Sequence, residues 1–366
     1  MNERYRIRKL PPVWFIRCIN AFRTALIGLN RRLFPANVVV YEQFQHFWLL
    51  PCLKVAAELD LAWILKEGPM TLEEIAGRVN ADPDALFRVM RALASQGFFR
   101  QLKDGRFANT RLSKPLADGQ GSMRNMILHH LGKVNWNLMG NLSYSVRSGE
   151  EAFTDLFGKG IYEFLSGHPE ESAIFERSMS NLTRLALDPL LNACDFSVFP
   201  ILADIGGGEG TLLAAILTRH PGIQGVLMDL PGSAARAGEA IRSKGLADRI
   251  RIVEGDFFSD PPPVADGYMI KNVLHNWGDP ECTRILRNIN KSMPTSGTLL
   301  ILEMIVEENN RPSFAKLIDI QMMVSMAGGR ERNLREFMSL LESSGFRISR
   351  IIPTIAPLSV IECKKI

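Results

Sequence analysis

The densest group of residues able to do chemistry is a glycine-rich loop with an acid just before it. Gly206-Gly207-Gly208-Glu209-Gly210 follows the apolar run ILADI, residues 201–205, and precedes the helical pattern TLLAAILTRH, residues 211–220. Glycines adopt backbone dihedral angles that other residues avoid, and they lack the Cβ atoms that would block a bound molecule. A strand, a glycine loop and a helix in this order predict a ligand site at the carboxyl end of the strand.

The acid in the same stretch favours a cationic ligand. The spacing of Gly206, Gly208 and Gly210 is GxGxG, whereas dinucleotide sites have GxGxxG. Asp204 stands two residues before the first of these glycines. Its carboxylate would repel a pyrophosphate but would attract the sulfonium or amino group of S-adenosylmethionine.

Further candidate ligands follow at the ends of the next predicted strands. Asp229 in GVLMDLP is placed to accept hydrogen bonds from both hydroxyls of a ribose, as the acid of dinucleotide folds does. Asp256 and Phe257 in VEGDFF offer an acceptor and an aromatic face, which suit an adenine ring. These residues extend the predicted site toward an adenosine.

A histidine supplies the candidate base. His275 lies in IKNVLHNWGD, just past the fourth predicted strand, and therefore at the ligand edge of the same sheet. An imidazole with a pKa near neutrality can take a proton from a phenol or enol hydroxyl while the oxygen attacks a methyl group. The sequence thus predicts that His275 activates an acceptor opposite the glycine loop.

The elements that must position these residues are strands alternating with helices. This alternation beyond residue 200 predicts a parallel sheet flanked by helices. The predicted strands are ILADI (201–205), GVLMD (225–229), IRIVEGD (250–256), GYMIKNVL (267–274), TLLILEMIV (298–306), FRISRII (346–352) and LSVIECKK (358–365).

Residues 38–118 predict a compact helical module. FQHFWLLPCLKVAAELDLAWIL, residues 44–65, indicates a buried helical stretch, and Thr71 with Glu74 forms a capping box at the start of the next helix. FFRQLKDGRFANT, residues 98–110, alternates around Asp104-Gly105 as a hairpin. Helix, turn, helix and hairpin together are typical of a winged helix.

A winged helix leaves a DNA-binding regulator as an alternative. The candidate recognition helix carries Arg88 and Arg91, but also Asp82 and Asp84. Phosphate recognition needs a strongly basic helix, so dimerisation or substrate gating is the favoured use of this module. We expect no nucleic acid as a partner.

The basic residues gather in the first 35 residues, which carry eight Lys or Arg and one acid, so the rest of the chain is slightly acidic. Apolar residues recur at steps of three or four between Val13 and Leu33, with arginines between them, which predicts an amphipathic helix with a basic edge. The favoured interpretation is packing on its own domain or on a second subunit. Weak docking on a membrane surface is the minority alternative.

Cysteine usage and hydropathy indicate the compartment. The five cysteines are scattered and show no CxxC spacing, which argues against a disulfide framework and against a zinc site. No apolar run reaches the length of a spanning helix, and we identify no signal peptide. We expect a cytoplasmic protein, with peripheral contact at the inner membrane surface as the minority alternative.

Six ordered motifs carry a resemblance to a known family: LADIGGGEGTLL, MDLP, EGDFF, KNVLHNWGD, LILEMIV and GGRER. From about residue 38 the chain resembles class I S-adenosylmethionine-dependent O-methyltransferases of the plant caffeic-acid type and their bacterial small-molecule relatives. The resemblance implies an α/β fold: a Rossmann-like methyltransferase domain with a mostly parallel seven-stranded sheet, and a mainly helical N-terminal winged-helix dimerisation domain. The implied segments are a basic extension (1–35), the winged-helix domain (36–118), a helical connector contributing to the acceptor pocket (119–200) and the cofactor-binding catalytic domain (201–366).

The resemblance also implies roles for single residues. It places the base at His275 and orienting acids at Glu303, which ends the apolar run LLILE, and at Glu331; the alternative of an exposed surface acid is stronger for Glu331. The family's usual Asp after the histidine is Asn276 here. The other implied residues are Leu230 and Lys271 at the cofactor, and Met179 and Met322, with Trp136, Phe153 and Asn276, around an apolar acceptor.

The predicted function is therefore methyl transfer from S-adenosylmethionine, without a metal, to a hydroxyl on an aromatic or other apolar small molecule, with S-adenosylhomocysteine as product. A homodimer and a role in secondary metabolism are expected from the resemblance. The alternatives are a C- or N-methyltransferase, and a non-methylating member of the fold such as a hydroxylase or decarboxylase. Retention of His275, Glu303 and Glu331 weighs against the non-methylating alternative.

Overall fold

The computed structural model describes residues 10–119 and 121–366, which form two compact units. The helical unit comprises Ala21–Asn137 and His168–Leu182. The sheet unit comprises Leu138–Gly167, Thr183–Ile366 and the described residues up to Asn20. Residues 1–9 of the predicted basic extension lie outside the described residues.

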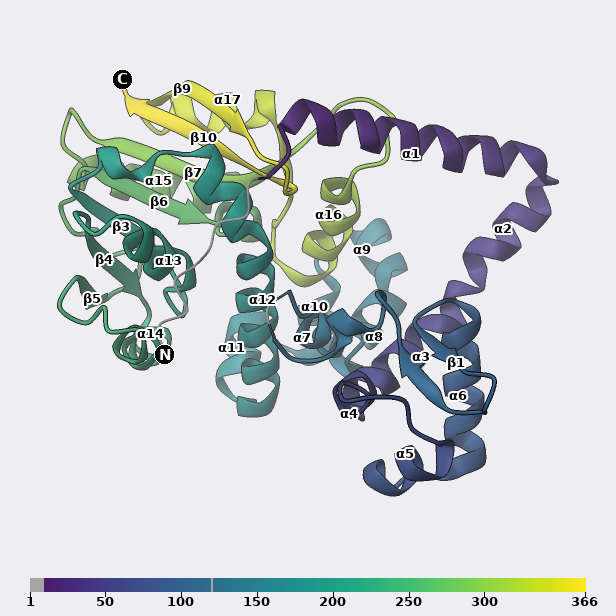
Figure 1. Cartoon of the computed structure of the whole chain (residues 1–366). Coiled ribbons are helices and arrows are strands. Elements are labelled where there is room, and N and C mark those ends of the chain that lie inside the picture. Colours follow the sequence, from purple (N-terminus) through teal and green to yellow (C-terminus); the bar gives the residue numbers. More distant parts are fainter. Residues whose placement is uncertain (1–9, 120) are drawn as a thin grey trace. The chain divides into compact units, whose positions relative to one another are not determined.

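The described residues of the N-terminal part of the chain are helical apart from one hairpin (Figure 1). Its elements are α1 (Val13–Leu33), α2 (Ala36–Phe44), α3 (His46–Glu58), α4 (Leu61–Ile64), α5 (Leu72–Val79), α6 (Pro83–Ser95), β1 (Phe99–Gln101), β2 (Phe107–Asn109), η1 (Lys114–Leu116), α7 (Arg124–His130) and α8 (Lys133–Gly140). They are followed by α9 (Leu142–Ser148), α10 (Ala152–Phe157), α11 (Ile161–Ser166), α12 (Pro169–Ala193) and η2 (Phe196–Val198).

The winged-helix part follows its sequence signals. Thr71 and Glu74 form the predicted capping box of α5, and the Asp82 side chain accepts the Ala85 N–H at the start of α6. Strands β1 and β2 pair antiparallel around the Asp104-Gly105 turn. These local signals succeed because each depends on residues only a few positions apart.

The stretch 44–65 differs from the prediction of one buried helix. It is divided among the end of α2, α3 and α4, with Asp60 in the left-handed region at φ 51° between the last two. Phe44, Phe47 and Trp48 at its start are exposed, whereas Leu53, Ala56 and Leu61 are buried. The C-terminal part of this apolar stretch therefore packs in a core, whereas its N-terminal part is exposed.

The sheet unit is built on one large sheet. Its strands are β3 (Ile201–Ile205), β4 (Gln224–Asp229), β5 (Ile250–Glu254), β6 (Gly267–Lys271), β7 (Thr298–Val306), β8 (Arg332–Asn333), β9 (Phe346–Pro353) and β10 (Leu358–Lys365). The main path has the order β5-β4-β3-β6-β7-β10-β9. β10 is antiparallel to both β7 and β9, and the other pairings are parallel. The predicted, mostly parallel seven-stranded sheet is confirmed.

One detail of the sheet departs from the prediction. The two-residue strand β8 pairs with β7 beside the main path and was not predicted. β7 has the predicted bounds, and Glu303, the last residue of the run LLILE, lies inside this strand.

Helices cover both faces of the sheet, as an open α/β fold requires. The connecting helices are α13 (Thr211–Arg219), α14 (Pro231–Ser243), α15 (Asp279–Ser292), α16 (Phe314–Ser325) and α17 (Leu334–Ser343), with η3 (Leu274–Asn276) after β6. Residues of α12, α13, α14 and α16 join one apolar cluster with the sheet, and residues of α15 and α17 join the other. The strand order reverses between β3 and β6, which places the switch point of the sheet there.

Candidate active site

The glycine loop lies at the switch point, at the carboxyl end of β3. Gly206 has φ +70° and Gly208 has φ +57°, both in the left-handed region that favours glycine. A Cβ on Gly206 would come within 3.1 Å of Val273 and 3.5 Å of Phe257. A Cβ on Gly208 would meet nothing within 4 Å, so the loop leaves open space at that residue.

Asp229 fixes the loop to the neighbouring strand. It ends β4, and its Oδ2 accepts the Gly208 N–H at 2.8 Å while its Oδ1 accepts the Leu230 N–H at 2.8 Å. Burial raises the pKa of Asp229, against these two hydrogen bonds. These hydrogen bonds hold Asp229, the predicted ribose acceptor, beside the open space at Gly208. The side chain of Leu230, the next residue, is exposed.

Asp204 lies beneath the loop. It is buried in β3, and a Cβ on Gly207 would lie 2.9 Å from its carboxylate. Burial raises the pKa of Asp204 to about 7, although the positive charge of Lys271 opposes the rise. Burial likewise lowers the pKa of Lys271, against the charges of Asp204 and Glu303. Burial thus disfavours the charged form of both groups, and a cation bound close to Asp204 would favour its ionised carboxylate.

Asp256 and Phe257 follow β5, two strands from the switch point. The Asp256 Oδ1 accepts the Phe258 N–H at 2.9 Å, which shapes the turn. The Phe257 ring lies against Gly206. The backbone carbonyl oxygen of Phe257 accepts a hydrogen bond from the Asn288 side chain on α15 at 3.0 Å. The structure therefore brings the predicted adenine face next to the glycine loop.

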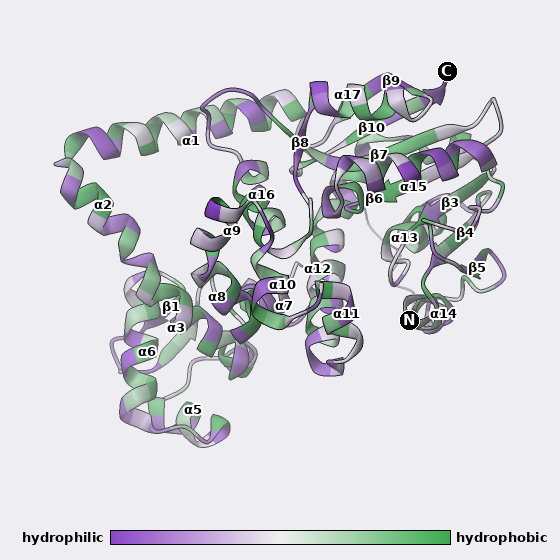
Figure 2. Cartoon of the chain, turned by 180° about the vertical axis from the view of Figure 1, so that it is seen from behind, coloured by the Kyte–Doolittle hydropathy of each residue, from purple (hydrophilic) through white to green (hydrophobic). Residues whose placement is uncertain are grey.

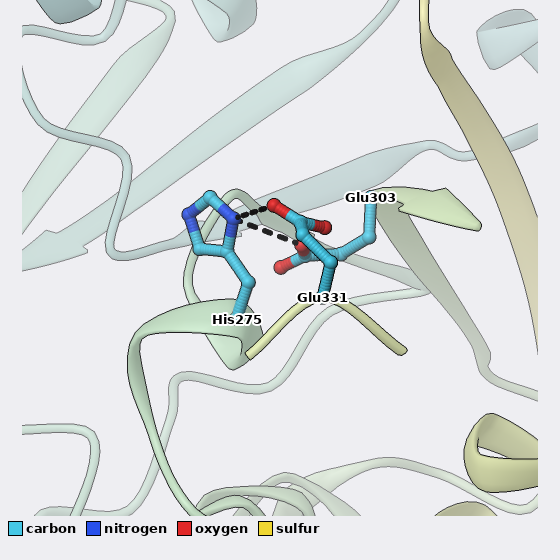
Figure 3. A group of neighbouring side chains, drawn as sticks. All are labelled: His275, Glu303 and Glu331. Carbon is cyan, nitrogen blue, oxygen red and sulfur yellow. Dashed lines mark hydrogen bonds and ion pairs between the residues drawn. The ribbon is translucent and has the colours of Figure 1, made fainter. Parts of the chain in front are cut away.

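His275 lies in η3 and faces two buried acids. Its Nδ1 is 2.7 Å from Glu331 Oε1 and 3.7 Å from Glu303 Oε2. Figure 3 shows both carboxylates on the Nδ1 side of the ring, with the other ring nitrogen directed away from them. Glu303 is 0% exposed and Glu331 is 5% exposed, so the alternative of an exposed surface acid at Glu331 is wrong.

The negative charges of Glu303 and Glu331 raise the pKa of His275. Burial alone would lower the pKa of His275, but the charge of Glu303 and the hydrogen bond and charge of Glu331 outweigh it and raise that pKa above its usual 6.5. Burial raises the pKa of Glu303, against the charge of His275. Because Nδ1 faces the carboxylates, it carries the proton, and Nε2 is the nitrogen left to act as a base.

Neighbouring groups hold the three side chains in place. Glu303 Oε1 accepts the N–H groups of Val273 and Leu274, at 3.0 and 2.9 Å, and so fixes the turn that leads to His275. The Glu331 N–H donates to Asp319 on α16 at 2.8 Å. Glu303 on β7 therefore fixes the turn that carries His275. Asp319 on α16 fixes the backbone of Glu331, the acid that contacts the His275 ring.

Arg332 is a site residue that the sequence reasoning missed. Its side chain is 1% exposed and donates to the carbonyl oxygens of Leu274 and Trp277, at 2.9 and 2.8 Å, and to Asp279 at 2.7 Å. It thereby clamps both ends of the turn that carries His275. The signal was present, because Arg332 is the last residue of the GGRER motif, but an arginine beside an acid in a polar stretch suggests the surface.

The candidate acceptor residues are divided between the two units. Trp136 and Met179 belong to the helical unit, where the Trp136 ring lies 6.1 Å from that of Phe47. Phe153 and Met322 belong to the sheet unit, where they lie on the contacting helices α10 and α16. Phe153 is 1% exposed and packs against Phe157 and Phe164, as an ordinary core residue does. Asn276 follows His275 directly, and its acceptor role stays a prediction.

His275, Glu303 and Glu331 are also the one group of potential metal ligands in the described part of the chain, with their ligand atoms within 4.8 Å of one another. The Nδ1 atom that a metal would need is already engaged by Glu331. The prediction of a site without a metal stays a prediction.

A glycine loop at the switch point of a doubly wound sheet, with an acid-held histidine at the same edge, is the arrangement of a Rossmann-like enzyme. The chain belongs to the O-methyltransferase family: residues 139–347 match the O-methyltransferase domain, and residues 41–119 match the O-methyltransferase dimerisation domain. The predicted family is thereby confirmed, and the DNA-binding alternative is not favoured.

Relatives match over nearly the whole chain. Phenazine O-methyltransferase PhzM of Lysobacter antibioticus is 35% identical, over 91% of this chain and 97% of the relative. The mitomycin biosynthesis 6-O-methyltransferase of Streptomyces lavendulae is 34% identical, over 90% and 95%. The crystal structure of human N-acetylserotonin methyltransferase in complex with S-adenosylmethionine superposes with a TM-score of 0.84, at 26% identity over 91% of this chain and 98% of that one.

Proposed function

We propose that this protein transfers the methyl group of S-adenosylmethionine to a hydroxyl oxygen on an aromatic or other apolar small molecule. The observation that carries the proposal is the 2.7 Å contact between His275 Nδ1 and the buried Glu331, in a chain of the O-methyltransferase family. A histidine held in this way is suited to take a proton from an attacking hydroxyl.

The residues at the switch point fit S-adenosylmethionine. The open space at Gly208 lies beside Asp229, which suits a ribose, and the buried Asp204 favours a positive charge nearby. When bound, this cofactor supplies an activated methyl group and leaves as S-adenosylhomocysteine. The residues proposed to hold it are Asp204, Gly206, Gly208, Asp229, Leu230, Asp256, Phe257 and Lys271.

In the proposed reaction the catalytic residues accept one proton from the acceptor and stabilise the charge that results. His275 Nε2 accepts the proton of the acceptor hydroxyl while Nδ1–H stays bonded to Glu331. The charge that forms on the imidazole is stabilised by Glu331 at 2.7 Å and by Glu303 at 3.7 Å. Such general-base assistance is worth roughly 10²–10⁴-fold in rate.

An aromatic acceptor is supported by the family members and by the candidate lining residues. The relatives named above act, by their names, on a phenazine and in mitomycin biosynthesis, which fits a role in secondary metabolism. Of the predicted lining residues, Met322 lies in the sheet unit with His275 and offers an apolar, polarisable surface that suits a flat ring. The acceptor roles of Trp136 and Met179 stay predictions. C-methylation and a non-methylating reaction are not favoured, because the chain matches the O-methyltransferase domain and the relatives named above are O-methyltransferases.

The experiment that tests the function uses hydroxylated phenazines, naphthoates and quinones as acceptors. With S-adenosylmethionine present, we expect at least one phenolic acceptor to gain the mass of one methylene, and its O-methyl ether blocked at the same position to gain none. Mass spectrometry measures both. Methylation on carbon or nitrogen alone, or oxygen insertion, would contradict the proposed reaction.

We propose further that α1 packs against a second copy of the chain. None of its 21 residues is buried, and its last turn carries Arg31 and Arg32 without an acid in the first. Hydrophobic and hydrophilic residues alternate along its length (Figure 2). α1 leads into α2, whose exposed Tyr41 and Phe44 lie at the start of the match to the family's dimerisation domain. No described helix combines the length and the apolar character needed to cross a bilayer.

Removal of residues 1–34 distinguishes a dimer arm from a membrane-surface helix. We expect the full chain to be a dimer and the dimer of the shortened chain to dissociate at higher protein concentrations. The reason is that α1, exposed in the single chain, would contribute buried apolar area to the dimer interface. Sedimentation velocity measures this, and flotation with anionic vesicles at low salt provides the comparison. Flotation of the full chain alone, with unchanged dimers in both, would contradict the arm and favour the membrane surface.

A further inference from the structure

Tyr162 lies beside the proposed cofactor edge although no motif points to it. It belongs to α11, and its hydroxyl oxygen accepts a hydrogen bond from the Asn276 side-chain amide at 3.0 Å. The same amide nitrogen donates to the Asn272 carbonyl oxygen at 3.3 Å, which fixes the orientation of the Asn276 side chain. Helix α11 is thereby tied to the turn that carries His275.

The ring of Tyr162 begins a row of aromatic side chains that ends at the glycine loop. It stacks on Trp277, with centroids 5.8 Å apart and planes at 20°. Trp277 meets Phe258 edge to face at 4.8 Å, and Phe258 meets Phe257 at 4.9 Å. Phe257 in turn lies against Gly206. The row lines the sheet unit from α11 to the proposed adenosine site.

Part of Tyr162 remains exposed although its ring is stacked and its hydroxyl is enclosed. The stacking on Trp277 covers one face, yet 42% of the residue is exposed. Burial raises the pKa of the Tyr162 hydroxyl, and the charge of the Asp229 carboxylate adds to the rise. Tyr162 is therefore bonded to the turn that carries the proposed base and feels the charge of the proposed ribose acid.

The chemistry of the donor places a positive charge in the same interval. In S-adenosylmethionine the sulfonium sulfur is bonded to the ribose, and its methyl group must reach the oxygen that His275 deprotonates. A ribose held at Asp229 and an acceptor held at His275 leave the sulfonium between them. Aromatic faces attract cations through the negative potential above the ring.

We propose that Tyr162 is a cofactor-positioning residue whose exposed ring face contacts the sulfonium, so that the site binds charged S-adenosylmethionine in preference to neutral S-adenosylhomocysteine. The inference rests on the proposed function. After transfer the sulfur is neutral, so the ring attracts the product less, and this weakening favours product release.

Calorimetry with both ligands on the full chain tests the proposal. We expect Tyr162→Leu to weaken S-adenosylmethionine binding about three- to tenfold and S-adenosylhomocysteine binding much less, since only the first ligand carries the sulfonium. Tyr162→Phe keeps the ring and should keep the wild-type ratio of the two dissociation constants within about twofold. Tyr144→Leu on α9 of the same unit is the control, with both constants unchanged.

The outcomes separate this proposal from the proposed function. A Tyr162→Leu variant that loses affinity for both ligands equally, or for neither, overturns the sulfonium contact while leaving the methyltransferase assignment intact. A wild-type chain that binds neither ligand overturns both. A changed ratio in Tyr162→Phe equal to that in Tyr162→Leu would mean that the hydroxyl rather than the ring face is responsible, which also contradicts the proposal.

Discussion

His275→Ala is expected to lower the rate of methyl transfer by about 10²-fold or more while cofactor affinity stays near the wild-type value. The substitution removes the Nε2 base but leaves the glycine loop, Asp229 and the loop's hydrogen bonds untouched. Single-turnover kinetics measures the chemical step, and calorimetry with S-adenosylmethionine measures binding. His46→Ala, at an exposed position on α3, is the matched control and should change neither quantity.

The pH dependence gives this prediction a second readout. Only the neutral imidazole accepts a proton, and the two acids raise the pKa of His275, so activity should increase as the pH rises through that raised pKa. Glu303→Gln removes one raising charge, but its amide oxygen can still accept the N–H groups of Val273 and Leu274. We expect an intermediate loss of rate and a shift of the acidic limb to lower pH. Undiminished turnover in His275→Ala would mean that proximity alone drives the reaction.

The strands were predictable because their signals are local. ILADI, TLLILEMIV and LSVIECKK match the observed bounds of β3, β7 and β10, since each is a short apolar run bordered by residues that break a strand. β8 has only two residues and exists because Arg332 and Asn333 pair with the end of β7. No period can develop over two residues, so such a strand is not visible in a sequence.

The candidate site was predictable in part, for a similar reason. The glycine loop and His275 follow strands, and the topology of a parallel sheet brings their ends to one edge. The burial of Glu331 was not predictable, because its GGRER context is polar and its enclosure depends on Asp319 and His275, which are distant in the sequence. The hydrogen bond between Tyr162 and Asn276 joins residues 114 positions apart, and neither residue signals the other.

The division of the predicted chain into segments 1–35, 36–118, 119–200 and 201–366 stays a prediction. The compact units do not follow chain order, because residues 138–167 belong to the sheet unit and residues 168–182 to the helical unit. A helical connector whose parts pack on different cores carries no composition shift that would mark the boundary. Sequence periodicity identifies its helices but not the core that each one joins.

Asp229→Ala and Gly208→Val are each expected to weaken S-adenosylmethionine binding by about tenfold to a hundredfold. For Asp229→Ala this is the effect of losing a hydrogen bond to a charged group. Asp229→Ala removes the proposed ribose acceptor and leaves the Gly208 and Leu230 N–H groups without their carboxylate. Gly208→Val forces a β-branched residue to φ +57° and fills the space that the ligand would need. Calorimetry on both variants measures the loss.

Backbone strain at Gly208 must be separated from the loss of space, and the chain offers a matched position. Gly245, after α14, has φ +67°, and a Cβ at this position would also meet nothing within 4 Å. Gly245→Val should therefore lower the melting temperature, as any strained left-handed residue does, and should keep wild-type cofactor affinity. Equal affinity in wild type, Gly208→Val and Asp229→Ala would remove the assignment of this loop to the cofactor, and an equal loss in Gly245→Val would reduce the Gly208 result to a general loss of stability.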